Sequence, residues 1–179
     1  MTPATLSILT MKTGQVRDYP LKVSSAQRLT WMPDGRSVIV GGGGLKGGSG
    51  LYRVDLSTGG FEPIVFDAKM ATVSPDGGTL FYAPTTRGGV VMRHLGSGQE
   101  KMIYPYPQWV QNMAVSPDGH WLAVKTRLPD TEGRASPSVL QLVPTSGGEP
   151  RLLWDLDSLE ADAHFRIAWS NDSKYLLSF

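Results

Sequence analysis

The sequence predicts an all-β protein, a β-propeller built from four repeats of a four-stranded sheet, or blade. Three observations lead to this prediction. A Pro-Asp-Gly phrase recurs at 31–35, 73–77 and 115–119, and a degraded copy lies at 169–173. Short runs of alternating apolar residues flank each copy, and Gly-rich turns separate the runs. No segment shows the apolar period of a helix over three turns.

The spacing of the phrase indicates a structural repeat with a late insertion. Pro33 and Pro75 lie 42 residues apart, Pro75 and Pro117 again lie 42 apart, and Asn171 follows Pro117 by 54. A constant period of this length is typical of propeller blades. The surplus of 12 residues in the last period falls in two connections, 127–137 and 155–163.

The chain begins with strands at 6–9 and 16–19 around a Thr13-Gly14 turn, which match the second hairpin of a blade. The first hairpin follows at the phrase itself, where Pro presets φ, Asp bonds to its own backbone and Gly accepts a positive φ. The predicted strands before and after the three complete phrases include 28–31, 37–40, 80–82 and 121–124.

A second hairpin follows the first in each period, with its own turn at 57–60, 96–98 and 145–148. Two hairpins in about 42 residues give the four strands of a blade. The chain closes with 167–169 and 175–179, which match a first hairpin. The terminal hairpins are therefore two half blades that together make a fourth blade.

We treat 1–179 as a single propeller domain or a propeller fragment. Three arrangements complete the split blade: a closed four-bladed ring, two chains that share an eight-bladed ring, or a longer propeller of which this chain is a piece. Joining the half blades would cover exposed strand edges, which otherwise favour aggregation.

The phrase, the apolar strand and the Gly turn resemble the WD40-like (PD40) repeats of TolB-type propellers over essentially the whole chain. The Gly-His pair that opens a true WD40 blade is absent, and Trp154-Asp155 is expected to follow the fourth strand. Similar repeats form the propellers of tricorn and of prolyl-oligopeptidase or dipeptidyl-peptidase relatives. Members of the resembled family usually have more than four blades, which favours a homodimer or a fragment.

Composition restricts the function. Lys and Arg total 17 against 16 Asp and Glu, so the net charge of +1 gives no field for nucleic acid or a membrane surface. Without cysteine there are no disulfides or thiol nucleophiles. The first ten residues lack the pattern of a signal peptide, and a soluble chain is expected. The compartment stays open: cytoplasm, or periplasm if the chain is a fragment.

The sequence predicts neither an enzyme nor a cofactor or metal site. The Gly pattern at 42–47 is followed by a strand and not by a helix, so 41–50 is expected to be a connecting loop. No Gly-x-Ser-x-Gly segment is present. His94, His120 and His164 are widely spaced, and the acidic run at 155–162 lacks the Gly of a calcium loop.

Most large aromatic residues near the phrase are expected to pack blade against blade, among them Trp31, Tyr82, Trp121 and Trp169. A different group lies in connections that a propeller displays on one face, where binding residues concentrate. We expect this group to contact a protein or peptide partner; its members are Tyr106, Trp109, Arg127, Arg134, Asp155 and Asp157.

Alternatives remain at this point. The lengthened connections can equally cover the surface or form a subunit contact. The chain can also be the substrate-gating propeller of a serine peptidase, or the sensory propeller of a bacterial signalling protein. A Gly-x-Ser-x-Gly segment, or a winged-helix or kinase segment, in an adjoining part of the gene would identify these alternatives.

Overall fold

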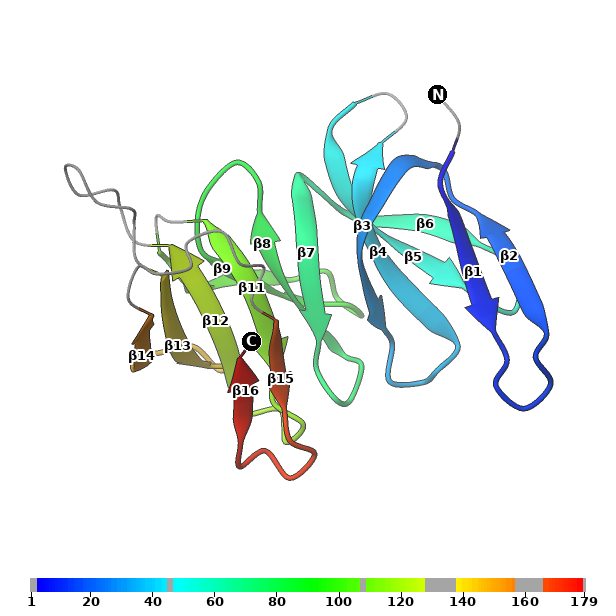
Figure 1. The fold of residues 1–179 in the computed structure, drawn as a ribbon. Coiled ribbons are helices and arrows are strands. Elements are labelled where there is room, and N and C mark those ends of the chain that lie inside the picture. Colours follow the sequence, from blue (N-terminus) through cyan, green and yellow to red (C-terminus); the bar gives the residue numbers. More distant parts are fainter. Residues whose placement is uncertain (1–2, 45–46, 107–108, 128–137, 157–165, 179) are drawn as a thin grey trace. The chain divides into compact units, whose positions relative to one another are not determined.

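The computed structural model describes residues 3–44, 47–106, 109–127, 138–156 and 166–178. These residues form strands and turns throughout, grouped in antiparallel sheets (Figure 1). The chain divides into two compact units, residues 1–71 and 72–179, which are described separately. Within the described ranges, no helix is long and apolar enough to cross a membrane.

The first unit contains one hairpin and one complete sheet. The hairpin pairs β1 (Thr5–Leu9) with β2 (Val16–Pro20). The sheet runs in sequence order through β3 (Val23–Trp31), β4 (Ser37–Gly44), β5 (Ser49–Asp55) and β6 (Phe61–Phe66). The hairpin packs on this sheet, and the Tyr19 hydroxyl donates a 2.6 Å hydrogen bond to the Leu56 carbonyl. The shared core is Leu6, Tyr19, Leu21, Val23, Val38, Val40, Tyr52 and Val54.

The next sheet joins β7 (Ala68–Val73), β8 (Thr79–Pro84), β9 (Val90–His94) and β10 (Glu100–Tyr104). The boundary between the two units falls within β7. The second unit continues with a sheet of β11 (Val110–Val115), β12 (Trp121–Arg127), β13 (Ser138–Pro144) and β14 (Arg151–Leu156). It ends with a hairpin of β15 (Ile167–Trp169) and β16 (Leu176–Ser178). Each complete sheet therefore consists of two successive hairpins, as the repeat predicts.

The phrase forms the turn of every first hairpin. The glycine of each complete copy has a positive φ: 63° at Gly35, 75° at Gly77 and 77° at Gly119. In the degraded copy Ser173 takes this position with φ 60°. Its amide donates to the Ser170 carbonyl at 3.0 Å, as the Gly119 amide does to Ser116 at 2.9 Å. The predicted chain reversals are confirmed.

The prediction that 41–50 is a connecting loop is wrong for most of that segment, because β4 ends only at Gly44 and β5 begins at Ser49. β4 continues through Gly44, and Gly41 and Gly42 pair with Leu51 and Gly50 across the sheet. A Cβ on Gly42 would lie 2.1 Å from the Ser25 carbonyl oxygen, so the strands approach too closely for any side chain. The glycines thus permit a close approach of β3 and β4.

Two further expectations are corrected. Trp31 does not pack against a blade within its unit: 55% of its side chain is exposed. Trp169 does pack as expected, and its indole N–H donates to the Ala114 carbonyl at 3.0 Å. Trp154-Asp155 does not follow the fourth strand of its sheet but lies within it, because Trp154 pairs with Leu140 and Asp155 with Val139.

Candidate functional site

The candidate site lies at one end of the β11–β14 sheet in the second unit. Val110, the first residue of β11, pairs with Thr126 near the end of β12. Arg127 then pairs with Ser138 at the start of β13, and Ser138 pairs with Leu156 at the end of β14. The connections that follow β12 and β14 therefore leave the sheet at the same end, beside the chain that enters β11.

A stacked aromatic pair anchors the chain that leads into β11. Tyr104, the last residue of β10, is 1% exposed, and its hydroxyl donates to the Gln141 carboxamide oxygen on β13. The Tyr106 ring stacks on Tyr104 with 5.2 Å between the ring centroids and 12° between the planes. Burial raises the pKa of Tyr104 to about 12, so the phenol remains a neutral hydrogen-bond donor at physiological pH.

Gly89 permits this arrangement. Its φ is 93°, and a Cβ there would lie 2.2 Å from the Tyr104 carbonyl oxygen. Only glycine fits so close to the backbone. The Tyr104–Tyr106 segment is thus held by backbone proximity, by a buried hydrogen bond and by ring stacking.

Trp109 stands out against this packed segment because 65% of its side chain is exposed. It immediately precedes Val110, and Arg127 immediately follows the partner of Val110, so the sheet register places Trp109 and Arg127 at the same sheet end. The Arg127 Nε is buried, and no acceptor among the described residues pairs with it. An exposed indole and an arginine whose buried Nε has no acceptor among the described residues therefore lie at one edge of the sheet.

A buried cation lies on the same strand. Lys125 is two residues before Arg127 on β12 and is only 2% exposed. Burial lowers the pKa of its ammonium group, because desolvation disfavours the charged form. This residue was not among those predicted to bind; it directly follows the predicted strand 121–124, and β12 extends through it.

Of the six residues predicted to bind a partner, the register places Trp109 and Arg127 at the same sheet end, and Tyr106 lies in the segment that leads toward Trp109. Arg134 and Asp157 lie outside the described residues. Asp155 is placed in β14 and not in the connection where it was expected, and its side chain is not among those described.

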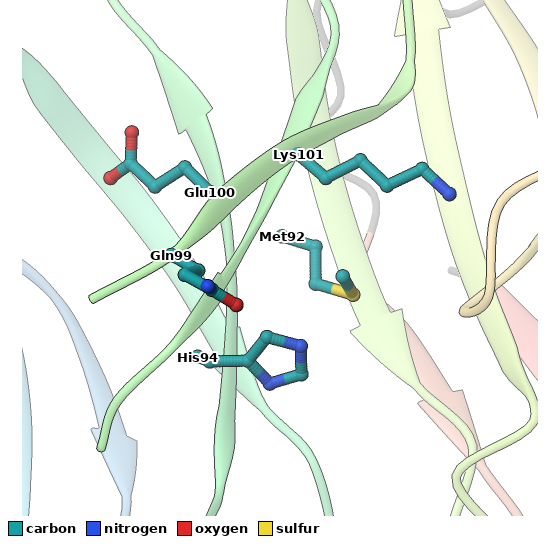
Figure 2. Close-up of a pocket in the computed structure, with 5 residues that line it drawn as sticks. All are labelled: Met92, His94, Gln99, Glu100 and Lys101. Atoms are coloured by element: carbon teal, nitrogen blue, oxygen red, sulfur yellow. The ribbon is translucent and has the colours of Figure 1, made fainter. Parts of the chain in front are cut away.

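A second feature is an open pocket of about 440 Å³ on the β9–β10 hairpin, lined by Met92, His94, Gln99, Glu100 and Lys101 (Figure 2). Met92 and Lys101 are paired across the hairpin and point to the same side, whereas Glu100 points away from them. The Lys101 ammonium donates to the Ser146 carbonyl at 3.2 Å, which ties this hairpin to the turn after β13.

The polar groups of the pocket are largely engaged with one another or with neighbours. His94 Nδ1 lies 3.5 Å from the Thr79 hydroxyl. The Arg93 guanidinium donates a 2.7 Å hydrogen bond to the Glu100 carboxylate, and the two groups form an ion pair. Within the described residues no three His, Cys, Asp or Glu side chains gather as metal ligands would. The sequence does not predict this pocket, because the alternation that indicates a hairpin does not show which of its side chains line a hollow.

Comparisons with solved structures show the fold. The chain is similar to TolB from Acinetobacter baumannii, with a TM-score of 0.75 and 19% identity over 97% of this chain and 42% of that chain. A putative TolB from Agrobacterium tumefaciens matches with a TM-score of 0.73 and 19% identity, over 98% of this chain and 70% of that one.

Enzymes also appear among the similar structures. Hydrazine synthase of Kuenenia stuttgartiensis matches with a TM-score of 0.71 and 21% identity, over 96% of this chain and 54% of that chain. The tricorn protease matches with a TM-score of 0.62 and 18% identity, over 93% of this chain and 16% of that chain. No protein-family model and no curated protein sequence matches the chain. The similarities identify the fold as a TolB-like β-propeller, and the chain spans less than half of the Acinetobacter protein.

Proposed function

We propose that this chain is a non-catalytic scaffold that binds a protein or peptide through an aromatic surface formed by Tyr106, Trp109 and Arg127. The observation that carries the proposal is the exposure of Trp109, 65% of its side chain, at the end of a well-packed sheet. Leaving a large indole in water forgoes the free energy of burial that a partner would supply.

The residue types support the same conclusion. Trp, Tyr and Arg are the side chains that most often dominate the free energy of protein interfaces. Tyr106 is held in place by its stacking on buried Tyr104, so little conformational entropy would be lost when a partner binds. Arg127 adds a guanidinium whose planar donors suit a carboxylate or a backbone carbonyl.

A second candidate is a propeller that gates substrate for a peptidase domain. The tricorn protease and prolyl endopeptidases among the similar structures favour it. A Gly-x-Ser-x-Gly segment encoded next to this chain would decide for that candidate, because a nucleophile elbow requires this spacing.

The test uses peptides selected on the unmodified protein from a phage-displayed random library. Trp109→Ala should weaken binding of the selected peptides by roughly 10-fold to 30-fold, as expected for an interface hot spot. Arg127→Ala should weaken most strongly those peptides that carry a carboxylate.

The matched control is Phe66→Ala, which removes an aromatic side chain of similar exposure, 68%, from the first unit. Affinity should change less than about twofold in this variant. Peptides that bind Trp109→Ala and Arg127→Ala as tightly as the unmodified protein would rule out the aromatic surface as the binding site.

A further inference from the structure

The two-stranded sheets correspond to opposite halves of one blade. In the β1–β2 turn the Gly14 amide donates to the Thr10 carbonyl at 2.8 Å, as Gly98 does to His94 in the turn between β9 and β10. The β15–β16 hairpin has the turn of a first hairpin. β1 and β2 are therefore third and fourth strands, and β15 and β16 are first and second strands.

In the first unit, the β1–β2 hairpin covers only part of the sheet beneath it. It packs over Val38 and Val40 of β4 and over Tyr52 and Val54 of β5, all of which are buried. Of the first strand, β3, only Val23 at its start belongs to the core shared with the hairpin. Leu29 and Trp31 share a face with their partners Val40 and Val38, yet they are 56% and 55% exposed.

The repeat shows that this exposure is unusual for the position. The residue that corresponds to Leu29 in the third complete sheet is Met113, which also lies two residues before the last residue of its strand and is 6% exposed. Ala71, the equivalent residue in the second complete sheet, is half-buried, so Leu29 is more exposed than the residues at this position in both of the other complete sheets.

The β15–β16 hairpin also has an uncovered apolar face, its outer face, which carries Tyr175 and Leu177. Tyr175, just before β16, is 71% exposed, and Leu177 within the strand is 59% exposed. The residues at the position of Leu177 in the second and third complete sheets are Phe81 and Ala123, which are 2% and 0% exposed. Leu177 therefore occupies a position that is buried in both of those sheets.

We propose that the β15–β16 hairpin of one chain completes a blade with the β1–β2 hairpin of a second copy. In this blade β1 pairs with β16, and the outer face of β15–β16 covers Leu29 and Trp31. Each uncovered apolar face would then be buried against the other, which extends the packing of β1–β2 on β4 and β5.

The complete sheets predict the register of this pairing. The second and third strands of each sheet begin their ladder with one bond: Leu56 N–H to Arg36 carbonyl at 2.9 Å, Leu95 to Gly78 at 2.9 Å, and Thr145 to His120 at 3.0 Å. The corresponding bond in the composite blade joins Met11 N–H to the Lys174 carbonyl. Continuing the antiparallel ladder places Thr10 opposite Tyr175, Leu9 opposite Leu176 and Ile8 opposite Leu177.

Two observations favour a second copy as the occupant. The chain matches 97% of its own length to only 42% of TolB, so it accounts for less than half of that chain. Two copies would supply six complete blades and two composite ones, within the usual range for propellers.

The area that would be buried suits a stable dimer. Each joint would cover six large side chains that are now 53% to 71% exposed, namely Leu9, Val16, Leu29, Trp31, Tyr175 and Leu177. At roughly 100 Å² each, two joints would bury roughly 1,200 Å² of side-chain surface, and stable interfaces begin at about this size.

Cysteine cross-linking tests the pairing, and the chain has no native cysteine to interfere. Thr10→Cys and Tyr175→Cys are prepared as separate proteins, mixed and oxidised. Thr10 and Tyr175 are both exposed and are predicted to be a directly opposed, non-hydrogen-bonded pair, a geometry that accepts a disulfide. The mixture should give a cross-linked species of twice the 19.4 kDa chain mass on a non-reducing gel.

The corresponding pair within one complete sheet is a positive control. Thr79 and His94 are paired in the structure, so a Thr79→Cys/His94→Cys double variant should form an intrachain disulfide and remain at 19.4 kDa. Thr10→Cys mixed with Ser97→Cys, an exposed turn residue far from the proposed joint in the repeat, should cross-link at least 10-fold less.

Two outcomes would overturn the proposal. A mixture of Thr10→Cys and Tyr175→Cys that cross-links no more than the Ser97→Cys control would exclude the pairing. A Thr10→Cys/Tyr175→Cys double variant that forms only an intrachain disulfide at 19.4 kDa would show closure within one chain. Neither result bears on the aromatic surface, whose peptide binding is measured separately.

Discussion

The serine and aspartate of the repeated phrase form a small hydrogen-bonded ring in three of its four turns; in the first copy Met32 replaces the serine. The Ser116 hydroxyl donates to Asp118 at 2.5 Å, Asp118 accepts the His120 amide at 3.0 Å, and the Trp121 amide donates back to Ser116 at 3.0 Å. Asp76 and Asp172 have the same partners in their own turns. The serine therefore aligns the turn and also stabilises the ionised carboxylate.

These bonds predict how stability depends on pH. The Ser116 hydroxyl, and then the His120 amide, lower the pKa of Asp118, and the corresponding bonds lower the pKa values of Asp76 and Asp172. A carboxyl with a lowered folded-state pKa binds fewer protons in the folded chain than in the unfolded chain. Its stabilising contribution is present above the unfolded pKa of about 3.9 and is lost as the pH falls toward the folded value.

Urea unfolding midpoints measured between about pH 2 and pH 6 should therefore rise with pH, most steeply below about pH 4. Asp118→Asn should flatten this rise, because one linked carboxylate is removed. Glu149→Gln, which removes an exposed acid outside the phrase, controls for the loss of one charge. An Asp118→Asn profile as steep as that of the unmodified protein would contradict the role given to the serine bond.

At the scale of elements, hairpins are the unit that the sequence predicts well. The turn residues and the alternation beside them are local, so the first and second hairpins appear where the repeat places them. Strand ends and long-range packing are less local. Gly41–44 lies in β4 because β3 approaches closely, and nothing within the glycine run itself indicates this approach.

This close approach leads to a stability prediction. Gly42→Ala should lower the free energy of unfolding by roughly 2–3 kcal/mol, the cost of overpacking, because its Cβ would clash with the Ser25 carbonyl oxygen at 2.1 Å. Thermal or urea unfolding measures the change. Gly96→Ala is the control, since a Cβ there meets nothing within 4 Å, and it should shift stability by less than about 0.5 kcal/mol. Equal stabilities of the two variants would show that β3 and β4 do not approach as described.

For the candidate site, the sequence predicts which residues belong to it but not how they are arranged in space. Trp109 was selected as an aromatic residue in a connection, and Arg127 as the start of a lengthened one. Their placement at one sheet end depends on the Val110–Thr126 pairing, which includes a bulge that local sequence does not specify. The pocket beside His94 and Lys101 is lined by one hairpin, and the turn and alternation that predict the hairpin do not predict the hollow on it.

At the scale of the whole molecule, the repeat predicts more than the fold of each blade. It also identifies which apolar side chains should be buried, and Trp31 and Leu177 depart from that pattern. The expectation that Trp31 packs against a blade fails within the described unit because a first hairpin is not there to cover it. The same repeat logic assigns that missing cover to the β15–β16 hairpin of a second copy.

Light scattering of the purified chain at micromolar concentration tests this account most directly, in parallel with the Leu177→Asp and Leu152→Asp variants. We expect a mass of twice 19.4 kDa for the unmodified chain and for Leu152→Asp, whose site is 55% exposed but outside the joint. Leu177→Asp should reduce the mass to 19.4 kDa, because a carboxylate would be buried against Trp31. An unmodified chain that scatters as a 19.4 kDa monomer would contradict the shared blade.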